Sequence, residues 1–205
     1  MLECLVLFGI LPALLATRWL RAPVLPVLWA TSLYCAWRLR RDRGWVSASS
    51  GRVAPGEWRR MLVTFLVTAA MLLVLVRVTH PGSLFAFPLR HPLGWAAFLA
   101  WYPLLSVLPQ EIIFRAFFFS RYRFLFGDGG WLVAGSALAF GLAHLAFHNP
   151  VAVALTLPGG LMFARTYRRT GTLLFVSLEH ALYGCLVFTI GLGPFLTEHP
   201  LRMLH

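Results

Sequence analysis

The chain has 205 residues, of which 59% are hydrophobic and only 12% are charged. This balance excludes an ordinary water-soluble domain and predicts an integral membrane protein. The net charge of +11 comes from 18 basic residues, all of them arginine. In a membrane protein such arginines set the topology and contact anionic lipid, so the charge predicts contact with the bilayer and no nucleic-acid partner.

Apolar runs recur along the whole chain and predict an all-α, polytopic transmembrane helix bundle of about seven spans. The Pro-containing second run and the short sixth run are the weakest candidates, because an upright span needs roughly 20 residues. Six or eight spans are therefore the alternatives. The runs cover residues 2–17, 22–37, 61–78, 93–119, 131–147, 151–164 and 172–196.

The first run is predicted to be a retained span and not a cleaved signal, because Glu3 stands where a signal has positive residues. One long polar connection, "RRDRGWVSASSGRVAPGEWRR", separates two N-terminal spans in residues 1–60 from a five-span remainder in residues 61–205. We interpret the two parts as one membrane domain.

The arginines are concentrated in three connections, at 38–60, 121–123 and 165–169. A seven-span arrangement puts these connections on one face, which the positive-inside rule makes cytoplasmic. The N-terminus is then inside and the C-terminus outside.

The three cysteines lie in apolar runs without metal-type spacing and are interpreted as small core residues; they are Cys4, Cys35 and Cys185.

Three of the predicted spans contain residues that are costly at membrane depth and normally need a partner or a function. Glu111 and Arg115 are four residues apart, so a helix places them on one face as an ion pair. The full set is Gln110, Glu111 and Arg115 in the fourth run, His144 and His148 in the fifth, and Glu179 and His180 in the seventh.

Depth can be measured along each helix from its cytoplasmic end at about 1.5 Å per residue. Glu111 then lies roughly 15 Å deep, His144 roughly 20 Å and His180 roughly 12 Å, so the three converge. His148 lies near the outer rim and is predicted to be outside the site. A carboxylate and two imidazoles suit a general base that activates water, and they equally suit a zinc site with an open position.

The stretches "QEIIFR", "FGLAH" and "EHALYG" resemble, in order and spacing, the motifs of the CAAX-protease and bacteriocin-processing family of intramembrane endopeptidases. The resemblance covers about residues 93–196. It implies that Glu111 takes the place of the second of two glutamates in the family's first motif, and that Arg115 takes the place of the arginine four residues later. It further implies a second motif of Phe140 with His144, and a third of His180 with Gly184, with Glu179 in a supporting place.

The sequence departs from that family pattern at two positions. Gln110 stands where the family has its first glutamate, and an amide cannot accept a proton. Gly184 stands where an asparagine would help to hold an oxyanion, so that task is left to His180, to the backbone or to the Gln110 amide.

The resemblance implies a glutamic-type protease with Glu111, His144 and His180 as catalytic residues, Gln110 as a supporting residue and no cofactor. The alternative is zinc held by the same three residues. The expected partner is a membrane-anchored protein or peptide substrate in a bacterial inner membrane; the oligomeric state is not predicted. The alternatives in function are an inactive immunity or scaffold homologue and a proton-linked transporter.

Overall fold

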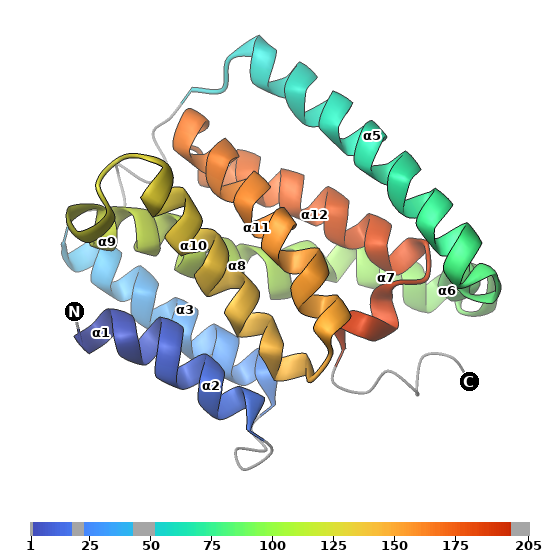
Figure 1. Cartoon of the computed structure of the whole chain (residues 1–205), viewed down its shortest axis with the longest axis horizontal. Coiled ribbons are helices and arrows are strands. Elements are labelled where there is room, and N and C mark those ends of the chain that lie inside the picture. The colour runs from blue at the N-terminus through green and yellow to red at the C-terminus, as the bar shows by residue number, and fades with distance from the viewer. Residues whose placement is uncertain (1, 18–22, 43–51, 198–205) are drawn as a thin grey trace.

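The computed structural model describes residues 2–17, 23–42 and 52–197, and every regular element among them is helical. Each apolar run of the sequence lies largely within helical structure, so the predicted all-α class is confirmed (Figure 1). The main helices are α1 (Leu2–Leu5), α2 (Leu11–Ala16), α3 (Val24–Arg41), α5 (Pro55–Thr79), α6 (Ala86–Arg90), α7 (Pro92–Tyr102), α8 (Leu108–Glu111), α9 (Phe118–Phe126), α10 (Gly130–Ala143), α11 (Pro150–Thr170) and α12 (Leu173–Thr189).

Shorter helical segments join or extend these helices. Three of them are π-helical, with bonds that span five residues instead of four. They are η1 (Val6–Ile10), η3 (Pro103–Val107) and η4 (Ile112–Phe117). The 3₁₀ segments are η2 (Pro81–Ser83), η5 (His144–Phe147) and η6 (Gly193–Leu196).

Three helical stretches of the described chain are long and apolar enough to cross a membrane, namely Pro55–Thr79, Pro92–Phe126 and Gly130–Phe147. Two further apolar helical stretches, Leu2–Ala16 and Leu173–Thr189, are shorter. The chain is therefore an integral membrane protein. The number of spans stays a prediction.

Helices α10 and α11 pack closely because α11 has a glycine at the contact. A Cβ atom on Gly160 would lie 2.9 Å from the Phe140 ring and 3.2 Å from the Ala137 carbonyl oxygen. Small residues of this kind let membrane helices approach at backbone distance. On one side of the bundle α5 lies along α12, and it exposes a long row of leucine and valine side chains suited to lipid (Figure 1).

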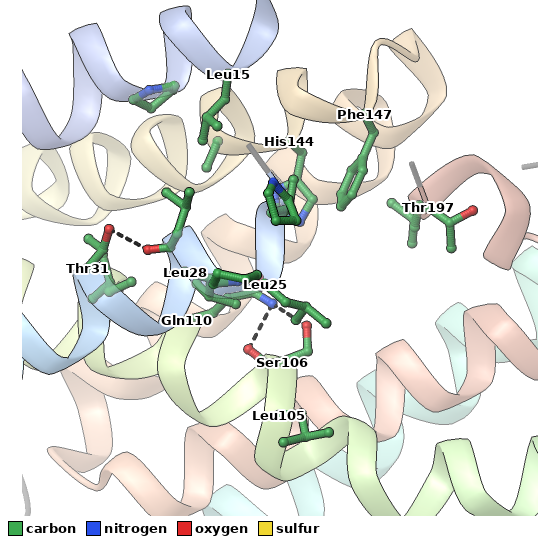
Figure 2. A pocket seen from close by; sticks show the side chains of 18 of the residues that line it. Leu15, Leu25, Leu28, Thr31, Leu105, Ser106, Gln110, His144, Phe147 and Thr197 are labelled. Carbon is green, nitrogen blue, oxygen red and sulfur yellow. Dashed lines mark hydrogen bonds between the residues drawn. The ribbon is translucent and has the colours of Figure 1, made fainter. Parts of the chain in front are cut away.

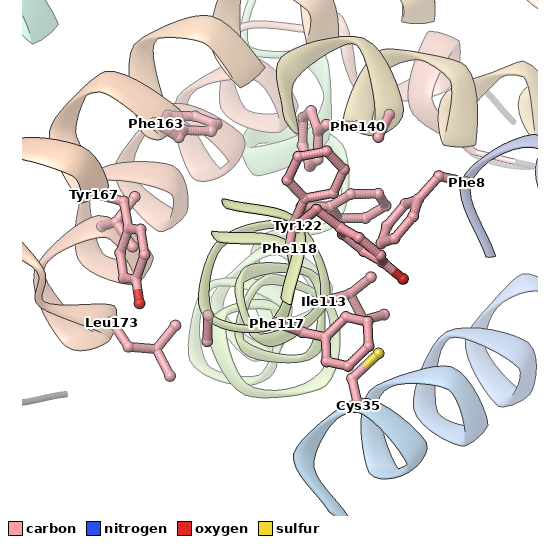
Figure 3. Packing of buried hydrophobic residues seen from close by; sticks show 14 of the residues in the cluster. Phe8, Cys35, Ile113, Phe117, Phe118, Tyr122, Phe140, Phe163, Tyr167 and Leu173 are labelled. Carbon is pink, nitrogen blue, oxygen red and sulfur yellow. The ribbon is translucent and has the colours of Figure 1, made fainter. Parts of the chain in front are cut away.

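The larger buried cluster contains residues from both sides of the polar connection (Figure 3). Phe8 of η1 contacts Phe114, Phe118 and Tyr122, with ring centroids 5.1 to 5.8 Å apart. Cys35 of α3 is fully buried in the same cluster, and all three cysteines are free thiols. The N-terminal helices thus share one core with the remainder of the described chain.

Ion pairs join several helix ends at one side of the bundle. Arg121 of α9 lies 3.0 Å from Glu3 and 3.5 Å from Asp42, and Arg169 of α11 lies 2.9 Å from Glu57. The arginine-rich connections therefore meet at the same end of the helices, as the topology prediction requires. Pairs this exposed add little stability individually.

Candidate active site

The polar stretch of the fourth apolar run lies in a long helix that is interrupted around the site. Pro103 begins η3, and a second proline, Pro109, lies one residue before Gln110. A proline cannot donate the usual helical hydrogen bond, and a π segment is one way for the neighbouring backbone to adjust. Gln110 and Glu111 end the short α8 and are followed directly by η4. Such π segments often mark functional sites.

Glu111 is fully buried, and both oxygens of its carboxylate face charged or polar groups. Its Oε1 lies 2.8 Å from Nδ1 of His180, and its Oε2 lies 3.3 Å from Nε of Arg115. The ion pair expected from the four-residue spacing is confirmed. The contact with His180 joins the long helix to α12, so Glu111 links two of the three predicted catalytic positions.

Arg115 is also completely buried, and it contacts a carboxylate, a carbonyl oxygen and two aromatic rings. Its guanidinium faces Glu111 and lies 3.4 Å from the Gly160 carbonyl oxygen. Its central carbon lies 4.6 Å from the ring centre of Phe140 and 5.6 Å from that of Phe163. Aromatic faces attract cations most strongly where water is excluded. Arg115 and Glu111 therefore neutralise each other inside the bundle.

Phe140 packs against both histidines of the predicted site. Its ring centre is 4.7 Å from that of His144 and 5.5 Å from that of His180. His180 also stacks on Phe163 at 4.6 Å, with only 22° between the ring planes. The aromatic rings of Phe140 and Phe163 thus pack against the His180 imidazole.

His144 and Gln110 line an apolar cavity of about 760 Å³ (Figure 2). The Gln110 Nε2 amide donates to the backbone oxygen and to the hydroxyl of Ser106, both at 2.9 Å. Nδ1 of His144 lies 2.7 Å from the Phe140 carbonyl oxygen, to which it donates. In the neutral imidazole this bond leaves Nε2 as a proton acceptor. The cavity wall therefore includes one basic nitrogen and one amide.

The structure divides the predicted catalytic set into a cavity residue and a buried pair. Among the described residues that line the cavity, His144 is present, whereas Glu111 and His180 are not. The carboxylate of Glu111 lies behind the wall, one residue beyond Gln110. Sequence reasoning predicted Glu111 as the base that activates water, which stays a prediction; its carboxylate contacts His180 and Arg115.

The remaining candidate residues occupy distinct environments. Glu179 is buried and accepts a side-chain hydrogen bond from Thr166. Glu179 does not line the cavity. His148 is exposed at the end of η5 and does not line the cavity either, in agreement with its predicted place outside the site. Gly184 lies in α12, one turn beyond His180, against the side chain of Tyr102.

The three alternative zinc ligands do not form a ligand set. Glu111 and His180 bond to each other, and Nδ1 of His144 is engaged with the Phe140 carbonyl oxygen. Within the described parts of the chain, no group of three His, Cys, Asp or Glu side chains could hold a metal ion. The residues present therefore do not fit the alternative zinc site.

Sequence reasoning missed most of the cavity wall. Helices α2 and α3 contribute a large share of it, although they lie outside the stretch that resembles the protease family. Tyr102 and Ser106 also line it, and they precede Gln110 by eight and four residues. A row of polar side chains at four-residue intervals was the available signal for these two residues.

Comparison with protein families gives one match. Residues 92–186 match the family model described as type II CAAX prenyl endopeptidase, Rce1-like. The match begins with α7 and ends in α12, so it includes Gln110, Glu111, His144 and His180. No curated protein and no solved structure matches the chain.

Proposed function

Because the chain belongs to the CAAX-protease family through residues 92–186, we propose that it is an intramembrane endopeptidase that cleaves membrane-anchored peptide substrates. The substrate class follows from the cavity, whose walls are mainly leucine, valine, proline and aromatic side chains. Such a space suits an apolar segment that enters from the bilayer, with a few polar groups to orient the peptide bond.

One observation carries this proposal: a basic imidazole nitrogen and an amide lie together on the wall of an apolar cavity. A water molecule that donates a hydrogen bond to Nε2 of His144 would lie beside Gln110. The Oε1 atom of Gln110 can accept a second hydrogen bond from that water. Polar groups that bind water in an otherwise apolar space are a suitable arrangement for hydrolysis.

The proposed reaction uses His144 as the general base. As the water oxygen bonds to the carbonyl carbon of the substrate, its proton passes to Nε2 of His144. The same proton then goes to the nitrogen of the scissile bond, and the carbon–nitrogen bond breaks. Glu111 accepts a hydrogen bond from His180, and Arg115 balances the charge of Glu111. The buried contacts among these three residues support the cavity wall on the side away from the cavity.

A second candidate function is a family member that binds a membrane segment without cleaving it. The observation that favours it is Gln110, because an amide on the cavity wall cannot accept the proton of water. A proton-linked transporter has less support. Its relay would need continuous polar contacts, whereas His144 bonds to the Phe140 carbonyl oxygen and His180 to Glu111.

Mass spectrometry of substrate C-termini tests the proposed function. The chain is co-expressed with candidate membrane-anchored proteins from the same genome, and the same is done with His144→Ala. We expect a shortened C-terminus that is produced by the wild type and lost in the variant. Binding of the same candidates without any shortened product would instead favour the non-catalytic function.

The proposed location is a bacterial inner membrane, with the N-terminus and the arginine-rich connections in the cytoplasm. Reporter fusions after Arg52, Gly127 and Arg168 are expected to report the cytoplasm, and fusions after Gly82 and at His205 the outside. The reason is the concentration of arginine at one end of the bundle. Opposite faces for Gly127 and Arg168 would contradict this topology.

Chelators are expected to leave the rate of cleavage unchanged, because the proposed proton transfers need only imidazole and carboxylate groups. The measurement is the rate of product formation before and after dialysis against a chelator, together with the metal content of the purified protein. Zinc at one ion per chain that disappears in His144→Ala would contradict the expectation.

A further inference from the structure

Tyr102 lies against Gly184 so closely that no other side chain fits between them. A Cβ atom added to Gly184 would lie 2.3 Å from the Tyr102 hydroxyl oxygen, 2.4 Å from Cε1 and 2.6 Å from Cζ. Non-bonded contacts of a Cβ atom under 3.0 Å essentially never occur in proteins. The phenol of Tyr102 therefore fills the volume that a side chain at position 184 would occupy.

The Tyr102 ring is held firmly in that position. It stacks on Phe98 with ring centroids 4.7 Å apart and 22° between the planes, and it lies 5.8 Å from Phe188. Tyr102 ends α7 immediately before η3 and lines the same cavity as Gln110 and His144. A ring with only two rotatable bonds, packed against Phe98 and Phe188, loses little entropy when its hydroxyl binds a ligand.

Three other polar side chains of the cavity wall already use their donors. The Gln110 amide has two hydrogens, and both point at Ser106. The Nδ1–H group of His144 donates to the Phe140 carbonyl oxygen. Thr31 donates to the Val27 carbonyl oxygen. The amide that sequence reasoning considered as an oxyanion donor is therefore engaged elsewhere.

Peptide hydrolysis in an apolar cavity needs a hydrogen-bond donor at the place where negative charge develops. When water adds to the carbonyl carbon, the carbonyl oxygen becomes an oxyanion, and a pre-positioned donor stabilises it. A phenol donates well to an oxyanion and keeps its own proton when the carbonyl forms again. Asparagine-type donors at position 184 are excluded here by the tyrosine ring.

We propose that the hydroxyl of Tyr102, lying over the bare backbone of Gly184, is the oxyanion donor of this protein. The proposal rests on the proposed endopeptidase function. It assigns to α7 a catalytic residue eight positions before Gln110, on the same cavity. It also explains why α12 has glycine one turn beyond His180, because any larger residue would displace the phenol.

Tyr102→Phe tests the proposal, because it removes the hydroxyl and leaves the stacked ring. We expect kcat to fall by about 10²-fold to 10³-fold, with KM nearly unchanged, since the bond forms only in the transition state. Tyr122→Phe is the matched control, because Tyr122 is buried in the core, does not line the cavity and loses the same atom. It should cleave at the wild-type rate.

A donor exchange gives a second test. Tyr102→Ala should lose cleavage, and adding Gly184→Asn to it places an amide donor in the vacated volume. We expect the double variant to cleave at least about tenfold faster than Tyr102→Ala. Gly184→Asn alone should be as slow as Tyr102→Ala, because its side chain collides with the ring. Melting temperatures of the purified variants show whether each one is folded.

The possible results separate this proposal from the function on which it rests. If the wild type cleaves and Tyr102→Phe cleaves at a rate within about twofold of it, the role of Tyr102 is overturned and the endopeptidase function is kept. Losing an oxyanion donor would slow cleavage far more. A wild type that cleaves no substrate overturns the endopeptidase function and the Tyr102 proposal together. A slowed Tyr102→Phe with a wild-type melting temperature and a normal Tyr122→Phe supports both.

Discussion

Gln110→Glu is expected to raise the rate of peptide cleavage by about 10²-fold or more, because a carboxylate at this position can accept a proton from water. Gln110 lines the cavity beside His144, so the new base would contact the same water. The rate of the variant should fall as the pH is lowered, because protonation removes the added base. The measurement is product formation from one substrate at neutral and mildly acidic pH.

The substitution also carries a structural cost that can be measured separately. The Gln110 amide now donates to the Ser106 backbone oxygen at 2.9 Å, and a carboxylate cannot donate there. We therefore expect a lower melting temperature together with the higher rate. Gln110→Asp is the matched control, because it adds the same charge but is one methylene group too short to reach the same water.

Two results would change the interpretation of the site. A folded Gln110→Glu that is no faster than the wild type would show that the water does not lie beside Gln110. A wild type without activity and an active Gln110→Glu would show that the cavity binds substrate while the chain itself has given up cleavage. The second result would favour the non-catalytic member of the family.

Local spacing predicted several contacts of the site correctly. The ion pair between Glu111 and Arg115 followed from four-residue spacing on a helix, and it is present at 3.3 Å. The all-α class followed from apolar runs, each of which lies largely in helical structure. These features depend on neighbours in the sequence, which is why the sequence alone was sufficient for them.

The division of the site between the cavity and the buried pair could not be predicted in the same way. A ruler of 1.5 Å per residue assumes a regular α-helix, whereas two π segments, η3 and η4, flank Gln110 and Glu111. Each π segment turns the following residues relative to a regular helix. Which of two adjacent side chains faces the cavity depends on that turn, and the sequence does not reveal it.

The contact between Tyr102 and Gly184 was equally inaccessible. It joins two helices that are far apart in the sequence, and glycine gives no positive signal of what lies against it. The same holds for the cavity walls from α2 and α3, which come from outside the family segment. Long-range packing of this kind appears only when the helices are assembled.

The buried pair of Glu111 and Arg115 provides the strongest expected effect on stability. Glu111→Gln is expected to lower the free energy of unfolding by about 3 to 5 kcal/mol, because it leaves the Arg115 charge buried without its partner. Both side chains are completely buried, so water cannot replace the lost contact. Unfolding in mixed micelles, followed by tryptophan fluorescence, measures the change. Asp128→Asn, in an exposed pair with Arg123, should change it by close to zero.

A double variant separates the structural role of Glu111 from a catalytic one. Glu111→Gln with Arg115→Met removes both charges together, and such exchanges are often neutral, so most of the lost stability should return. Cleavage should stay slow in the double variant, because His180 still lacks the carboxylate that accepts its Nδ1–H bond. If Glu111 were itself the base that contacts water, the stabilised double variant would lose cleavage by about 10² to 10⁴, whereas His144→Ala would lose much less. That result would assign the proton transfer to Glu111 and not to His144. The cavity would then have to extend past Gln110 to reach the Glu111 carboxylate.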